Sequence, residues 1–292
     1  MALRAMEFAG AWYPRDAAAC ERHIRDWWRE APAAPSAAAA APAAWLGVAP
    51  HAGWVYSGAL AAQTFQALAG AADAASAVQL AIVLGGHLRP SDPIVAMLEG
   101  EWETPLGALP IHGGFRDELT PLRPLRLETA QRHVADNSTE LQLPFVRYAF
   151  PAAELLPLRV PPGPLALALG QRLAEYLERT GLRAVAVAST DLTHYGPGYG
   201  FEPRGRGAEA LRWVREENDP AFIAALESGE AQRVLDVSQR CQNACSAGAV
   251  AAVAELARRH GLRFQTLGYA TSADGRPGES DTFVGYLAGV YR

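Results

Sequence analysis

The sequence of 292 residues is poor in cysteine and has no excess of basic side chains. Three cysteines are an odd number for so long a chain, so they do not form the disulfide framework of a small secreted protein. Lys and Arg total 26 against 31 for Asp and Glu, which leaves a net charge of −5. Without a basic surface that could follow phosphates, we expect no nucleic-acid partner.

Long hydrophobic runs are also missing. No window of the sequence approaches the ~20 apolar residues that are needed to span a bilayer. The first residues, MALRAMEFAGAWYP, contain no uninterrupted apolar core of signal-peptide length. We therefore expect a cytoplasmic protein without a membrane partner. In a reducing compartment, a functional cysteine would act as a nucleophile or as a metal ligand.

What the sequence does contain is a regular alternation of strand-like and helix-like segments. Short apolar runs have the length of strands that are buried on both faces of a sheet, and they lie at 45–50, 77–84 and 182–188. Further strand-like segments lie at 154–160, 263–271 and 282–291. Helical spacing occurs at 16–30, 58–70, 164–180 and 246–260. This order predicts a single α/β domain over 1–292, with a mostly parallel central sheet flanked by helices.

The segment 31–44 interrupts this pattern, because it contains only Ala, Pro and one Ser. Its prolines prevent a continuous helix, and its side chains offer little to pack. We interpret it as an Ala/Pro-rich loop insertion.

Histidines and an aspartate follow the three apolar runs. His51 comes after the first run, His87 after the second, and Asp191 with His194 after the third. Ligands of open α/β sheets bind at the carboxyl ends of the strands, where such loops meet. Three of the seven histidines of the chain fall at these ends. A single loop histidine would be unremarkable, but this grouping predicts a site.

Cys245 precedes the predicted helix 246–260, where the helix dipole favours a thiolate. Cys241 lies four residues earlier and is interpreted as a small core residue. Two histidines and one thiolate could make a three-ligand metal site, with zinc, copper or iron as suitable ions. Asp191 and His194 would then orient ligands and transfer protons, or act as ligands themselves.

Other residues near the strand ends have two interpretations each. Trp54 and Tyr56 follow His51 and either form the wall of a substrate pocket or pack against the sheet. Arg89 follows His87 and either holds an anionic group or forms a surface salt bridge.

Seven segments of the chain resemble the Memo family in order and spacing: AGAWYPRD, PHAGWVYSG, GGHLRPSD, NSTELQLPF, STDLTHYG, NACSAG and GYATSAD. The family includes proteins named AmmeMemoRadiSam system protein B, and its fold resembles that of class III extradiol dioxygenases, which hold non-haem iron on two histidines and a carboxylate. The resemblance runs from about residue 4 to the C-terminus.

The resemblance implies that His51 and His87 are the two histidine ligands and that Cys245 replaces the carboxylate. It also implies that His194 is the catalytic base and that Asp191 belongs to the site. Asn137 departs from the family, which usually has a histidine there, and an amide cannot carry a proton as imidazolium does.

Three functions fit these residues. The first is an oxygen-dependent oxidoreductase with iron or copper, or else zinc, acting on a small substrate such as an aromatic compound. The second is a copper- or iron-binding redox protein that docks a protein partner without turnover. The third is a cysteine or serine hydrolase, because ACSAG at 244–248 misses the G-x-S-x-G motif by one residue.

Overall fold

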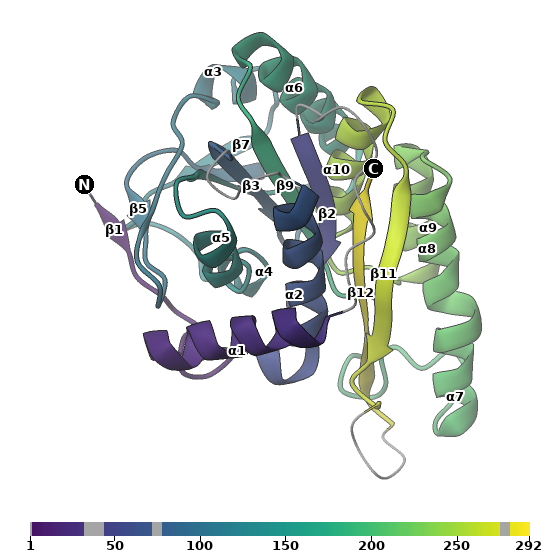
Figure 1. The fold of residues 1–292 in the computed structure, drawn as a ribbon. Coiled ribbons are helices and arrows are strands. Elements are labelled where there is room, and N and C mark those ends of the chain that lie inside the picture. Colours follow the sequence, from purple (N-terminus) through teal and green to yellow (C-terminus); the bar gives the residue numbers. More distant parts are fainter. Residues whose placement is uncertain (1, 32–43, 72–77, 275–280) are drawn as a thin grey trace.

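The computed structural model describes residues 2–31, 44–71, 78–274 and 281–292. Within these residues, nine strands form one sheet in the order β10-β12-β2-β9-β3-β8-β4-β7, with β11 paired to β12 (Figure 1). Its strands are β2 (Ala44–Ala49), β3 (Leu80–Gly85), β4 (Ile94–Met97), β7 (Leu125–Glu128), β8 (Glu154–Arg159), β9 (Ala184–Ser189), β10 (His194–Tyr195), β11 (Phe264–Thr271) and β12 (Phe283–Tyr291). A smaller sheet joins β1 (Leu3–Arg4), β5 (Glu101–Trp102) and β6 (Leu109–Pro110).

The four central strands, β2, β9, β3 and β8, are parallel, as the sequence predicts. The flanks are not uniform, because β12 pairs with β2, and β4 with β8, in the antiparallel direction. The sheet is therefore mixed around a parallel centre. The predicted insertion at 31–44 lies almost wholly outside the described residues.

Helices cover both faces of this sheet. They are α1 (Ala17–Glu30), α2 (Trp54–Ala71), α3 (Arg116–Leu119), α4 (Asn137–Glu140), α5 (Leu143–Ala149), α6 (Pro164–Thr180), α7 (Ala208–Trp213), α8 (Asp219–Glu227), α9 (Ala231–Cys241) and α10 (Ala247–Arg259). A π-helical turn, Val214–Asn218, joins α7 to α8. None of the helices in the described ranges is long and apolar enough to cross a membrane.

Alternate residues of the central strands pack into two different cores. In β3, Leu80, Ile82 and Leu84 belong to the core formed with α6 and α10. Ala81 and Val83 belong to the core formed with α1, α2 and α5 on the opposite face. Figure 1 shows α2 crossing one face of the sheet while α6 and α10 lie behind it. Because both faces are buried, these strands read as continuous apolar runs and not as alternating ones.

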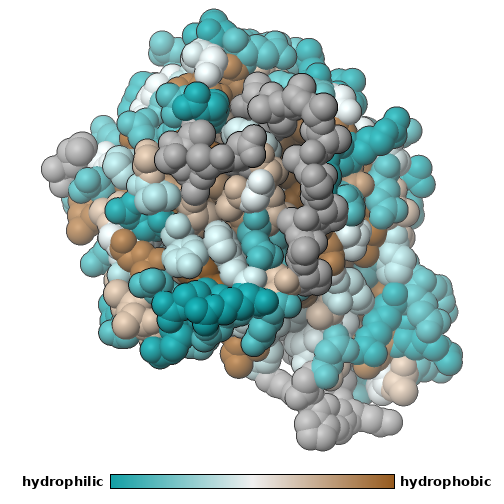
Figure 2. Space-filling model, viewed as in Figure 1, coloured by the Kyte–Doolittle hydropathy of each residue, from teal (hydrophilic) through white to brown (hydrophobic). Residues whose placement is uncertain are grey.

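The first helix is amphipathic and covers the core beneath it. Asp16 caps α1 by accepting a hydrogen bond from the backbone N of Ala19 at 2.8 Å. Cys20 and Ile24 are buried on its inner side, and its outward face is hydrophilic in Figure 2. Burial raises the pKa of Cys20 to about 12, so this thiol is not activated.

A buried carboxylate attaches the N-terminal segment to the rest of the fold. Glu140 in α4 accepts hydrogen bonds at Oε1 from the backbone N–H groups of Glu7 and Phe8, each at 2.8 Å, and from the Tyr13 hydroxyl at 2.9 Å. Its side chain is fully buried, and burial raises its pKa. One carboxylate oxygen thus satisfies three donors of a segment that otherwise has little regular structure.

Replacing this carboxylate tests its structural role. Glu140→Ala leaves three donors without their acceptor, so we expect a loss of about 3 kcal/mol in the free energy of unfolding, measured with urea. Glu140→Gln retains an amide oxygen as acceptor and should lose clearly less. Equal losses in the two variants would contradict a role as hydrogen-bond acceptor.

Candidate metal centre

Three neighbouring parallel strands deliver the predicted residues to one edge of the sheet. β9 lies between β2 and β3, and Ala49 of β2 pairs with Ser189 of β9 where both strands end. His51, His87 and Asp191 each follow the last residue of their strand by two positions. The strands end at the same level, so the loops that carry these side chains lie side by side.

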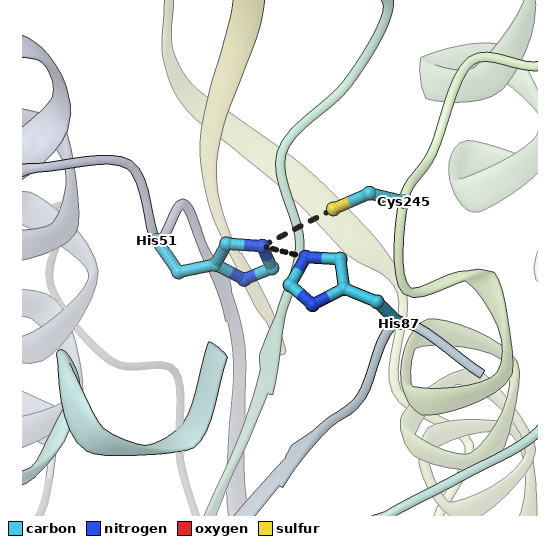
Figure 3. A group of neighbouring side chains, drawn as sticks. All are labelled: His51, His87 and Cys245. Carbon is cyan, nitrogen blue, oxygen red and sulfur yellow. Dashed lines mark hydrogen bonds between the residues drawn. The ribbon is translucent and has the colours of Figure 1, made fainter. Parts of the chain in front are cut away.

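His51, His87 and Cys245 point toward one another from three separate segments (Figure 3). Nε2 of His51 lies 3.0 Å from Nε2 of His87 and 3.2 Å from Sγ of Cys245. The ligand atoms of these three residues all lie within 4.8 Å of one another. They form the group of side chains in the described ranges that could hold a metal ion.

The loop between α9 and α10 places Cys245 at this edge. The backbone N–H of Asp191 donates to Sγ of Cys245 at 3.2 Å, and the backbone N–H of Cys245 donates to the carbonyl of Asp191 at 3.2 Å. The thiol also lies just before α10, a helix of 13 residues. An N–H donor and a helix N-terminus therefore both lie at this sulfur, and metals bind cysteine as the thiolate.

The ring of His51 is oriented by a serine and a glutamine. Its Nδ1 lies 3.0 Å from Oγ of Ser189, and Nε2 of Gln142 donates to the same Oγ at 2.9 Å. Gln142 also donates to the carbonyl of Pro50 at 2.8 Å. A proton on Nδ1, donated to Ser189, leaves the Nε2 lone pair of His51 directed at His87 and Cys245.

The carboxylate of Asp191 is directed at backbone groups. Its Oδ1 accepts hydrogen bonds from the N–H groups of His51 at 2.7 Å and Ala52 at 3.2 Å. The side chain is only 3% exposed. Of the two roles that the sequence leaves open for Asp191, this geometry corresponds to orienting the ligand loops.

His87 is supported from behind by a buried acidic residue. Its Nδ1 lies 4.0 Å from Oδ2 of Asp136, which also lies 3.9 Å from a guanidinium nitrogen of Arg159. Gly86 precedes His87 with a φ of +105°, and a Cβ there would lie 2.7 Å from Cβ of Arg159. Glycine is therefore required for the chain to pass this close to β8.

His194 lies in β10, beside the three ligands. Its Nδ1 lies 3.1 Å from the carbonyl of Leu192, so Nδ1 carries the proton and Nε2 keeps its lone pair in the neutral ring. Burial lowers the pKa of His194 below its ordinary value, although Asp191 and the Leu192 carbonyl act in the opposite direction. The neutral, proton-accepting form therefore predominates near pH 7.

The donor set fits a transition-metal ion. Neutral imidazole nitrogens and a thiolate are ligands that zinc, copper and iron accept, whereas magnesium and calcium prefer oxygen. Zinc binds these atoms at about 2.0–2.3 Å, so two ligands of one ion lie at most about 4.4 Å apart. The separations of 3.0 Å and 3.2 Å from Nε2 of His51 lie within this limit. Nε2 of His51 and Nε2 of His87 lie 3.0 Å apart. If both carried lone pairs, they would repel each other, so a proton or a cation between them would stabilise this arrangement.

A cavity of about 400 Å³ opens in front of the histidines. His51, His87 and His194 line it together with Tyr56 and with Asn137, whose Nδ2 donates to the His51 carbonyl at 3.3 Å. Further lining residues are Trp12, Ala52, Gly53, Asp191, Tyr199, Ser272, Thr282, Phe283, Val284 and Tyr286.

Two residues that the sequence suggests for the pocket are located elsewhere. Trp54 is 5% exposed and packs against Phe145, with ring centroids 4.6 Å apart, so it belongs to the core. Arg89 is exposed and does not line the cavity, and its backbone N–H donates to Asp92 at 2.7 Å. The pocket wall thus includes Tyr56 but neither Trp54 nor Arg89.

Sequence reasoning missed the residues that orient the ligands. Ser189 and Gln142 lie inside the segments STDLTHYG and NSTELQLPF, but nothing in their spacing shows that they meet at His51. Asp136 and Arg159 are far apart in the sequence and meet only through the sheet. Tyr199 and Tyr286 line the cavity from segments in which no motif indicates a site.

An α/β sheet that brings two imidazoles and one thiol together at the carboxyl ends of its parallel strands defines a candidate metalloprotein. A family model described as Memo-like protein matches residues 4–290, so the chain belongs to the Memo family, in agreement with the resemblance of its motifs.

Relatives of this family match most or nearly all of the chain. A MEMO1 family protein of Pyrococcus abyssi is 30% identical over 84% of this chain and 86% of that protein. One from Pyrococcus furiosus is 29% identical over 99% of both chains, and one from Methanothermobacter thermautotrophicus is 29% identical over 97% and 98%. A crystal structure of an uncharacterized Escherichia coli K12 protein has a TM-score of 0.47 at 10% identity, covering 73% of this chain and 86% of that one.

The hydrogen bonds around His51 can be tested through metal affinity. Ser189→Ala removes the acceptor of the His51 Nδ1–H, so we expect zinc affinity to fall by about 10–100-fold in a competition assay with a chelating dye. Ser228→Ala removes a hydroxyl outside the site and should leave the affinity unchanged. Unaltered affinity in Ser189→Ala would show that Ser189 does not orient the ligand.

Proposed function

We propose that this Memo-family protein is a metal-dependent oxidoreductase that acts on a small organic substrate, with His51, His87 and Cys245 as metal ligands. The observation that carries the proposal is the convergence of these three side chains at the strand ends, beside a cavity. A structural zinc site would be closed by a fourth protein ligand, whereas three protein ligands leave a position open.

Iron or copper bound there would supply one-electron and oxygen-dependent redox chemistry. The thiolate donates more charge than a carboxylate does, and it makes copper a stronger competitor for the site than in a site with two histidines and a carboxylate. Zinc would fit the same ligands but would supply no redox step.

His194 is the proposed proton acceptor. It lines the same cavity as the two ligand histidines, its Nε2 carries the free lone pair, and its lowered pKa keeps the ring neutral. A hydroxyl group bound in this cavity could therefore give its proton to His194. Asp191 would hold the ligand loops and, by its charge, stabilise the imidazolium that forms.

Asn137 limits the available proton transfers. Its amide donates to the backbone of His51 and cannot carry a proton at the position where relatives usually have histidine. In this chain, therefore, the proposed proton transfer depends on His194 without help from position 137.

The hydrolase alternative receives little support from the backbone around Cys245. A nucleophile elbow joins a strand to a helix, whereas residues 242–246 join helix α9 to helix α10. The thiol is also directed at His51, whose backbone N–H, and not its ring, contacts Asp191. This arrangement lacks the order of nucleophile, base and orienting acid.

Metal content is the first test. Protein purified without oxygen should contain, or take up on titration, about one iron or copper ion per chain, measured by mass spectrometry of the metal. Cys245→Ala should lower the affinity at least tenfold, whereas Cys241→Ala, four residues away, should not. Wild-type protein that neither contains nor acquires metal would refute the proposal.

Turnover is the second test. Iron-loaded or copper-loaded protein should consume oxygen with at least one member of a broad panel of catechols and other phenols. His194→Gln should retain the metal but lose at least a hundredfold in kcat, because general-base catalysis contributes about 10²–10⁴-fold. Stoichiometric metal without oxygen uptake on any substrate would favour the alternative of a redox or docking protein without turnover.

A further inference from the structure

A second and larger cavity, of about 700 Å³, reaches the candidate metal centre from another direction. Cys245 lines this cavity but not the smaller one, whereas His51 and His87 line only the smaller one. His194 and Tyr199 line both. The metal-binding group therefore lies between two cavities, with its thiol on one side and its imidazoles on the other.

The volume of the larger cavity is typical of a small-molecule site. Its apolar surface comes from leucines, prolines and Phe201, and helix α9 forms a polar wall beside it. Pro162 and Pro164 follow β8, and Leu88 and Pro90 follow His87. Rigid residues near the ends of β3 and β8 thus define the cavity, which favours a pocket that exists before a ligand binds.

The polar wall carries amide side chains and a carboxylate. Gln232, Asp236 and Gln239 are spaced at i, i+4 and i+7 on α9, and all three line the cavity. Nε2 of Gln232 donates to Oδ1 of Asp236 at 2.8 Å, which orients this amide and leaves its Oε1 as an acceptor. Gln242, directly after the helix, adds a third glutamine.

Gln242 also adopts a costly backbone conformation. Its φ is +50°, in the left-handed region where helices usually end on glycine or asparagine. Within the described ranges, the other residues with positive φ are glycines. A glycine would relieve this cost but would provide no side chain to the cavity.

The charge of the lining is one-sided. Asp236 contributes a carboxylate to the cavity lining. Among the described residues that line the cavity, none is Lys or Arg. The two arginines of α9, Arg233 and Arg240, lie outside the lining. Away from the thiol, an anion placed here would lose water without gaining a cationic side chain as a partner, and Asp236 would repel it.

We infer that the larger cavity binds the organic substrate of the metal centre, and that this substrate is a neutral molecule with an apolar body and hydroxyl or amide groups, not a carboxylate or a phosphate. This inference rests on the proposed function. Three glutamines can donate and accept hydrogen bonds with such groups, and the apolar surface holds the body.

A pair of probes that differ in charge tests the inference: 4-hydroxyphenylacetamide and 4-hydroxyphenylacetate. Their dissociation constants are measured by NMR titration of metal-free and zinc-loaded protein. The amide should bind at least tenfold more tightly than the carboxylate. Equal affinities, or no binding of the amide at millimolar concentration, would overturn the inference.

Charge placed in the cavity should reverse this preference. Gln239→Lys should improve carboxylate binding at least tenfold relative to the amide. Gln131→Lys adds the same charge at an exposed position outside the cavity and should change neither probe. An equal effect of both variants would mean that net charge, and not this cavity, selects the probe. Gln232→Lys repeats the test at a second cavity position.

Metal content is measured on the same samples, which separates the two proposals. Selective binding of the amide, reversed by Gln239→Lys, in protein that takes up no metal would refute the proposed function and leave the cavity assignment intact. Protein with stoichiometric metal but without selectivity between the probes would refute the cavity assignment alone.

Discussion

The site depends on the hydrogen bonds of Asp191. Its carboxylate accepts from the backbone N–H groups of His51 and Ala52, and its own backbone exchanges hydrogen bonds with Cys245. Asp191, which follows the last residue of β9 by two positions, thereby holds the loop after β2 close to the loop before α10. At this distance the imidazole of His51 and the thiol of Cys245 meet. Because both contacts involve backbone groups, the positions of His51 and Cys245 depend on the path of the chain and not on rotamers alone. This is how a residue that is not among the three converging ligands can determine their geometry.

A second layer of polar groups holds the ligand side chains in place. His51 is held by Ser189 and Gln142, and His87 lies against Asp136, which in turn lies near Arg159. Buried polar groups stabilise a unique arrangement only when their partners are present. The imidazoles therefore face each other as a consequence of contacts behind them. The polar network favours a site that is formed before the metal binds.

Much of the framework follows from local sequence, because β2, β3 and β9 are continuous apolar runs and the residues after them are identifiable as strand ends. Short strands such as β10, with two residues, carry no detectable period. Trp54 shows where the local pattern is not sufficient. Helix α2 begins at Trp54, four residues before the sequence pattern indicates, and residues two apart on a helix face different directions. Trp54 therefore enters the core while Tyr56 reaches the cavity. The contacts of Ser189 and Gln142 with His51 join residues far apart in the chain, so only the folded sheet reveals them.

The division of the metal-binding group between two cavities has a chemical consequence. Ligands that approach from the histidine side meet Tyr56, Asn137 and the polar groups after β11, whereas ligands that approach from the thiol side meet amides and apolar surface. His194 lines both cavities. It does not belong to the group of His51, His87 and Cys245. A proton acceptor in that position can serve a substrate in either cavity. Because Asn137 cannot carry a proton, the chemistry of both sides would depend on the same imidazole, and a single substitution at His194 would affect both.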